Sequence, residues 1–266
     1  MSRRIALLSS VSLVVFALIS PVAFSTQAQA ECSITRGGGT VANPDPGATI
    51  TCTTPTDSVG IGPSSANNVT VDVRSGAVIS VDSAAASGLG IGLGDAAQIS
   101  IAGDIIASGK TGATGISAGN DLSLFVLSGA AVSVNTNASS SATAVVAADR
   151  ANITVAGNLN ASGTGSTGIQ AGDDLSLSVL SRASVNATGL FGASAVTAAD
   201  RANITLTGDL IASGKSSTGI LAGNDLSLLV LSGAKISAES TSYASEEDRG
   251  IRPRASMGSW LTLVQV

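Results

Sequence analysis

Six aspartates recur along the middle of this chain at nearly constant spacing. Successive members lie 26, 28, 25, 26 and 25 residues apart: Asp95, Asp121, Asp149, Asp174, Asp200 and Asp225. If the chain stacks in repeats of that length, the carboxylates form one column at a corner of the stack. Neighbouring carboxylates would repel one another by somewhat under about 1 kcal/mol per pair in water, and Arg150 and Arg201 lie beside the column. We expect Asp turn residues here, with calcium binding as the alternative.

A catalytic interpretation would start from the adjacent Asp173 and Asp174, with Arg182 a short distance further along. Some β-helix enzymes cleave acidic polysaccharides with clustered Asp and a basic side chain. However, Asn120-Asp121 and Asn224-Asp225 occupy the same place in the other repeats, so the pair does not stand out. The chain has no histidine, which excludes Ser/His/Asp and Cys/His nucleophilic machinery. We therefore expect no enzyme and no cofactor; a polysaccharide lyase or hydrolase is the alternative.

The elements that carry these aspartates are repeats of two kinds. One phrase occurs three times: TGISAGNDLSLFVLSGA at 114–130, TGIQAGDDLSLSVLSRA at 167–183 and TGILAGNDLSLLVLSGA at 218–234. A second phrase alternates with it: ISIAGDIIASGK at 99–110, ITVAGNLNASGT at 153–164 and ITLTGDLIASGK at 204–215. A turn position follows each strand, held by Gly76, Gly103, Gly129, Gly157, Arg182, Gly208 and Gly233. Arg182 is the one member of this series that is not glycine.

Each repeat contains short strands and has no room for a helix. Apolar and polar residues alternate with period two, as in Leu122, Ser123 and Leu124, which is typical of half-buried strands. One repeat cannot bury its own apolar face, but stacked repeats can. The pattern predicts an all-β, right-handed parallel β-helix over 69–238, with about seven to eight coils of roughly 26 residues. Leu124 and Leu177 should then be buried, with Ser123 and Ser176 on the surface.

Composition restricts the partners. Aromatic residues make up 2% of the chain and charged residues 12%, and the formal net charge is −5. Nucleic-acid binding needs a basic surface, so nucleic acid is excluded as a partner. Trp260 and Tyr243 cannot by themselves build the aromatic platform that polysaccharide grooves usually present. The core must consist of Val, Ile, Leu and Ala.

The first 30 residues resemble a signal peptide. Arg3 and Arg4 precede an apolar run that ends before Pro21, and Ala28-Gln29-Ala30 matches the small-residue cleavage pattern. We expect cleavage before Glu31; a retained membrane anchor and a twin-arginine route are the alternatives. All three interpretations take the chain out of the cytoplasm.

Two cysteines follow the predicted cleavage site. In an exported chain, Cys32 and Cys52 are expected to form a disulfide in an N-terminal cap over 31–68. Such a loop closure stabilises by about 3 kcal/mol in the chain-entropy account. Metal binding is the alternative, although two thiols without further ligands make a poor site.

The signal sequence, the segment ATITCTTPTDSVGIG and the repeats that begin with NNVTVDVRSGAVISV resemble the passenger regions of bacterial autotransporters, adhesins of the pertactin and AIDA type. The resemblance covers residues 31–238. It implies type V secretion, an outer-membrane β-barrel as partner, a place on the cell surface, and adhesion, aggregation or biofilm formation. The partner would be a host surface, an abiotic surface or another copy of the chain. A barrel-less structural repeat protein is a further alternative.

The barrel that the family carries has no counterpart in this sequence. Residues 239–266 depart from the repeat, because TSYASEEDRGIRPRAS interrupts it before MGSWLTLVQV returns to something like GNDLSLLVL. We expect this segment to be degenerate or truncated by a damaged reading frame near residue 240. Without its own barrel, the chain is expected in the periplasm or the medium.

Overall fold

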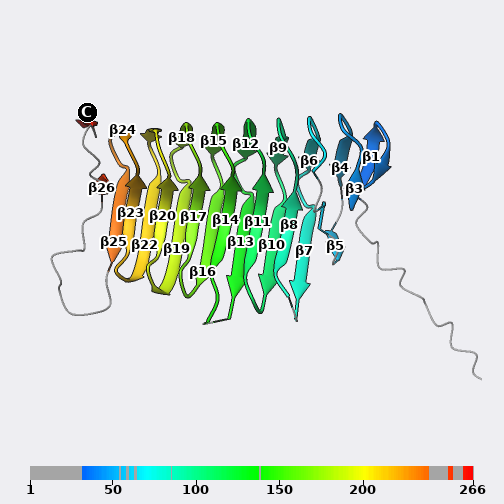
Figure 1. Ribbon diagram of the computed structural model, residues 1–266, viewed down its shortest axis with the longest axis horizontal. Helices are drawn as coiled ribbons and strands as arrows, with labels where there is room; N and C mark the ends of the chain where they lie inside the picture. Colours follow the sequence, from blue (N-terminus) through cyan, green and yellow to red (C-terminus); the bar gives the residue numbers. More distant parts are fainter. Residues whose placement is uncertain are drawn as a thin grey trace, which may run out of the picture.

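The computed structural model describes residues 32–53, 55–57, 60–62, 65–84, 86–137, 139–239, 251–253 and 260–265. Every regular element in these ranges is a β-strand, and the strands stack along the long axis of the molecule (Figure 1). The ranges contain no helix with the length and hydropathy needed to cross a bilayer. The predicted signal peptide lies outside them.

Three sheets run along the stack, and their strands pair in parallel except at the N-terminal end of the first sheet. The first has the order β1-β4-β6-β9-β12-β15-β18-β21-β24-β27. Its strands are β1 (Cys32–Arg36), β4 (Thr49–Cys52), β6 (Thr70–Val73), β9 (Gln98–Ile101), β12 (Leu122–Val126), β15 (Ala151–Val155), β18 (Leu175–Val179), β21 (Ala202–Leu206), β24 (Asp225–Val230) and β27 (Trp260–Gln265).

The second sheet has the order β25-β22-β19-β16-β13-β10-β7-β5. It contains β5 (Pro55–Asp57), β7 (Val78–Ser83), β10 (Asp104–Gly109), β13 (Ala131–Thr136), β16 (Asn158–Gly163), β19 (Ser184–Phe191), β22 (Asp209–Lys215) and β25 (Lys235–Glu239). The third sheet, β26-β23-β20-β17-β14-β11-β8, contains β8 (Gly88–Gly92), β11 (Ala113–Ala118), β14 (Ala142–Ala147), β17 (Thr167–Ala171), β20 (Ser194–Ala198), β23 (Thr218–Ala222) and β26 (Ile251–Pro253).

Each coil takes one strand from each sheet in turn, as β12, β13 and β14 do. Six coils of this kind run from β6 to β23, and β24, β25 and β26 add a seventh. Counterpart strands pair in parallel about one repeat apart, so Leu124 lies beside Ile99 of the preceding coil and Ile153 of the following one. The predicted parallel β-helix with a repeat of roughly 26 residues is confirmed.

The core is a set of files of aliphatic side chains that run parallel to the rod axis. In the first sheet one such file consists of Ile99, Leu124, Ile153, Leu177, Ile204 and Leu228. Leu124 and Leu177 are each only 1% exposed, whereas Ser123 and Ser176, which precede them in their strands, are exposed. The predicted strand register is therefore confirmed at both positions. Isoleucine and leucine have equal volume, so the alternating file keeps the width of the core constant.

An antiparallel strand covers the first sheet at the N-terminal end. β1 pairs antiparallel with β4, and Cys32 and Cys52 form the predicted disulfide. β4 itself pairs in parallel with β6, so the parallel stack already begins inside the segment predicted as a cap. A short hairpin of β2 (Gly39–Thr40) and β3 (Asn43–Pro44) lies beside it. The strand β1 occupies an edge that would otherwise expose unpaired backbone groups.

The C-terminal strands continue two of the sheets. β26 pairs with β23, and β27 pairs with β24, placing Trp260 beside Asp225 and Leu261 beside Leu226. The sequence WLTLVQ thus forms the next strand of the first sheet after DLSLLV, although it comes later in the chain than the repeat length predicts. Residues 240–250 and 254–259 of the predicted degenerate segment lie outside the described residues.

Candidate functional site

The six predicted aspartates lie at the start of the first-sheet strands or in the turns just before them, and the register divides them into two adjacent columns. Ala151 lies opposite both Leu122 and Leu175, and Ala202 opposite both Leu175 and Leu226. The residues just before these positions form one column, in chain order Asp121, Arg150, Asp174, Arg201 and Asp225. The remaining predicted members, Asp95, Asp149 and Asp200, precede this column by one residue and lie beside it. The prediction of a single all-Asp column is corrected to one column of alternating charge and a second, acidic and amide column.

Two bidentate ion pairs hold the alternating column together. Arg150 donates from Nε and Nη2 to the two carboxylate oxygens of Asp121, over 2.6 and 2.7 Å. Arg201 repeats this geometry with Asp174, over 2.5 and 2.7 Å. Both pairs are largely exposed to solvent, so their effect on stability is small and is screened by salt.

The ion pairs change the acidity of their carboxyl groups. The hydrogen bonds from Arg150 lower the pKa of Asp121, and those from Arg201 lower the pKa of Asp174. The same contacts raise the pKa of each arginine further above its ordinary value. These carboxylates stay ionised at any pH near neutrality and are unsuited to donate a proton.

The second column has the turn role that the sequence predicts. The Asp95 carboxylate accepts a 2.8 Å bond from the backbone N–H of Asn120, one coil further along. Asp149 accepts from the backbone N–H of Arg150 over 2.9 Å, and Asp200 accepts from the side-chain amide of Asn224. Across the described ranges, no group of three or more Cys, Asp or Glu side chains is arranged to hold a metal ion.

A strand separates the aspartate pair of the catalytic alternative, Asp173 and Asp174, from its arginine, Arg182. Asp174 immediately precedes β18 and is bound to Arg201, whereas Arg182 follows the other end of β18. Arg182 has a φ of 68°, in the left-handed region, and its counterparts Gly129 and Gly233 have φ values of 86° and 89°. Arg182 is thus a turn residue in a position suited to glycine, and the structure does not bring it to the aspartate pair.

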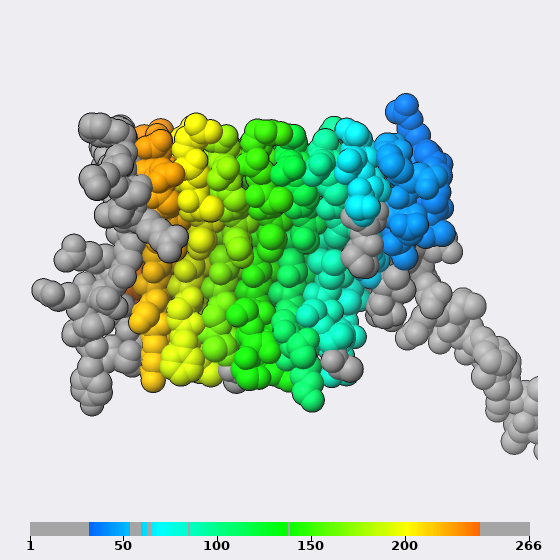
Figure 2. Space-filling model, in the orientation of Figure 1, coloured from blue at the N-terminus to red at the C-terminus, as the bar shows by residue number. Residues whose placement is uncertain are grey.

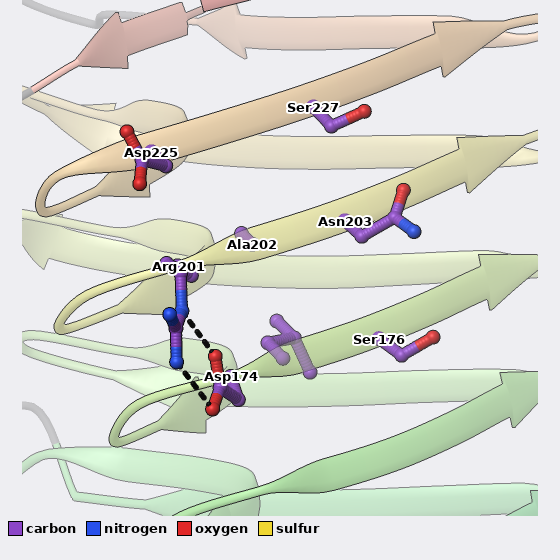
Figure 3. A pocket seen from close by; sticks show the side chains of 8 residues that line it. Asp174, Ser176, Arg201, Ala202, Asn203, Asp225 and Ser227 are labelled. Atoms are coloured by element: carbon purple, nitrogen blue, oxygen red, sulfur yellow. Dashed lines mark hydrogen bonds and ion pairs between the residues drawn. The ribbon is translucent and has the colours of Figure 1, made fainter. Parts of the chain in front are cut away.

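Two shallow hollows lie over the first sheet beside the alternating column. One, of about 370 Å³, is bounded by Asp174, Arg201 and Asp225 at the strand starts and by Ser176, Asn203 and Ser227 on the outer face. Figure 3 shows these polar side chains in two rows, with one residue of each row on every coil, and the Arg201–Asp174 ion pair lies within the row at the strand starts. The other, of about 360 Å³, repeats the arrangement with Asp121, Arg150, Asp174, Ser123, Asn152 and Ser176.

Sequence reasoning missed the Asp–Arg alternation and the exposed Phe125. The signal for the first was present, because aligning the buried Ile153 with Leu124 places Arg150 beside Asp121. Phe125 is 46% exposed on β12, where the period-two pattern places it on the same face as Ser123. Searches against protein-family models, curated proteins and solved structures find no match to this chain.

Proposed function

We propose that this chain is the exported rod of a cell-surface adhesin or structural stalk, similar to an autotransporter passenger, and that it is not an enzyme. The observation that carries the proposal is the repetition of the outer surface. Stacked coils give a continuous core and present the same side chains at every second coil, as the two hollows do. The space-filling view in Figure 2 shows the coils as successive bands along the rod. Repeated surfaces suit multivalent attachment, in which weak contacts add up.

Two further features support export without catalysis. A disulfide at the N-terminal end suits an oxidising compartment outside the cytoplasm. Arg150 and Arg201 are bound to Asp121 and Asp174, and the lowered pKa values of these two aspartates make them poor general acids. The partner would be a host surface, an abiotic surface or a second copy of the chain.

Expression of the full chain in a Gram-negative host tests export directly. We expect a mature N-terminus at Glu31 and oxidised Cys32 and Cys52 in the periplasm, in the medium or at the cell surface, and adhesion of beads coated with the purified protein to cells, to plastic or to one another. Cytoplasmic retention with reduced thiols would contradict the proposed export. Release of unsaturated or reducing ends from acidic polysaccharides, with or without calcium, would favour the lyase or hydrolase alternative instead.

A further inference from the structure

The two hollows over the first sheet are copies of one site. We call the hollow nearer the N-terminus the first and the other the second. Asp121, Arg150 and Asp174 of the first correspond to Asp174, Arg201 and Asp225 of the second, two coils further along the rod. The outer-face residues correspond in the same way, Ser–Asn–Ser in both. Because Asp174 and Ser176 belong to both hollows, the two form one trough parallel to the rod axis.

The groups along the trough are suited to hydroxyl-rich, uncharged ligands. A guanidinium has five N–H donors, of which the ion pairs use those on Nε and Nη2, so each arginine keeps donors for a ligand. The carboxylates are acceptors, and the serine hydroxyls and asparagine amides are both donors and acceptors. Positive and negative charges alternate along the trough, which therefore offers no extended basic surface to a polyanion.

The spacing of the copies indicates a polymer. Parallel strands lie about 4.8 Å apart, so equivalent groups two coils apart are separated by about 10 Å. This is the length of one disaccharide in an extended β-1,4-linked chain. An extended peptide is disfavoured, because peptides gain affinity by pairing with a free strand edge, and the trough lies on the face of a sheet whose strands are already paired on both sides.

We propose that this trough binds an extended, uncharged polysaccharide along the rod axis, with one disaccharide for every two coils. The inference rests on the proposed function and names the ligand class of the adhesive surface. Each copy lacks the large aromatic platform of a strong sugar site, and Phe125, next to Ser123 on the outer face, is the apolar contact available to the first copy. Affinity must therefore come from simultaneous use of both copies.

The test measures binding of the purified chain to soluble β-1,4-linked N-acetylglucosamine oligomers of two to six units by calorimetry, and to insoluble chitin and cellulose by sedimentation. We expect dissociation constants that fall at least tenfold between two and four units, when an oligomer first spans both copies. Asn203→Lys places a long side chain across the second hollow, where its ammonium reaches the flanking carboxylates. In this variant the affinity for four units should no longer exceed that for two units by tenfold, while the affinity for two units should stay within about twofold of the unchanged chain.

The double variant Asn152→Lys and Asn203→Lys should bind at least tenfold more weakly than the unchanged chain at every length. Ser162→Lys, on the exposed face of β16 in the second sheet, adds the same charge outside the trough and is the matched control, expected within about twofold. Equal loss in the control, unchanged binding in the double variant, or tighter binding of polygalacturonate or of an extended peptide would each overturn the assignment. Absence of glycan binding with normal adhesion of coated beads would overturn the assignment and leave the proposed function standing.

Discussion

A coil makes two different contacts with its neighbours, and the difference defines a unit of two coils. We call the coils that begin with β12, β18 and β24 the Asp coils, and those that begin with β15 and β21 the Arg coils. Each Arg coil reaches back to the Asp coil before it through a bidentate ion pair. No such pair joins Arg201 to Asp225 of the following coil among the described contacts. From β12 to β23 the coils thus form two pairs, and each pair is joined by an ion pair in addition to the continuous strand pairing.

The turns after the first-sheet strands show the same asymmetry. In the Asp coils the turn glycine has positive φ and open space around it, as at Gly129. In the Arg coils the glycine lies under the turn of the preceding coil, and a Cβ on Gly157 would lie 2.2 Å from the Ala130 carbonyl oxygen. Similar repeats therefore need glycine for two different reasons: positive φ at Gly129 and close approach of a neighbouring backbone at Gly157.

The largest effect tests whether the two kinds of coil share one core. Leu124→Asp in an Asp coil and Ile153→Asp in an Arg coil should each destabilise by about 4 kcal/mol or more, because each buries an unpaired charge. Urea unfolding measures both. Their outward neighbours provide the controls, since Ser123→Asp and Asn152→Asp should change stability by less than about 0.5 kcal/mol. A large cost at Leu124 and a small one at Ile153 would show that the coils differ in the core as well as at the turns.

The second prediction separates the two kinds of turn. Gly157→Ala should cost about 3 kcal/mol, because backbone atoms of the preceding turn must move. Gly129→Ala should cost about 1 kcal/mol, which is the strain of an alanine at positive φ. Both are measured from denaturant midpoints at constant m-value. If the two substitutions had equal costs, the turn asymmetry would have no energetic meaning.

The third prediction uses the arginine that replaces glycine in an Asp-coil turn. Arg182→Gly should stabilise by about 0.5 to 1 kcal/mol, since relief of strain at a φ of 68° exceeds the added entropy of the unfolded chain. Arg182→Ala removes the same side chain without relieving the strain and serves as the control. A gain in melting temperature for both variants would assign the effect to loss of charge.

The smallest effect concerns the ion pairs within the coil pairs. The pKa values of Asp121 and Asp174 are lowered in the folded state from an ordinary value of 3.8. Their contribution to stability is therefore complete above that value and is lost as the pH falls through the folded pKa. Arg150→Gln with Arg201→Gln should lower the urea midpoint slightly at pH 7 and leave it nearly unchanged at pH 2.

Salt and a distant arginine control this experiment. Added salt should reduce the difference between the double variant and the unchanged chain at pH 7, because the pairs are exposed. Arg36→Gln, at the end of β1, removes a positive charge away from the column and should not alter the pH dependence. An equal difference at pH 7 and pH 2 would mean that the arginines stabilise by packing alone.

The spacing of the repeats was sufficient to predict the coils but not the order of charges along their corner. Period-two alternation is enforced by burial, so Leu124 and Leu177 could be placed from their neighbours alone. The corner residues are exposed, and the segments between strands vary in length, so equal spacing of aspartates did not mean equal position. Asp149 precedes Arg150 by one residue, and only the pairing of Ile153 with Leu124 determines which of the two faces Asp121. The hollows depend on that single-residue shift and could not be predicted from spacing.

The alternating column also restricts how the gene for such a rod can change in length. Loss of one coil would bring Asp121 next to Asp174, so the two carboxylates would repel each other without an arginine between them. Loss of the 53 residues from Leu122 to Asp174 would instead join Asp121 to Leu175 and keep every contact type in place. Unequal recombination between copies of the repeat would therefore be tolerated in steps of two coils. Rods of this type should differ among strains by multiples of about 10 Å, each step adding or removing one whole hollow.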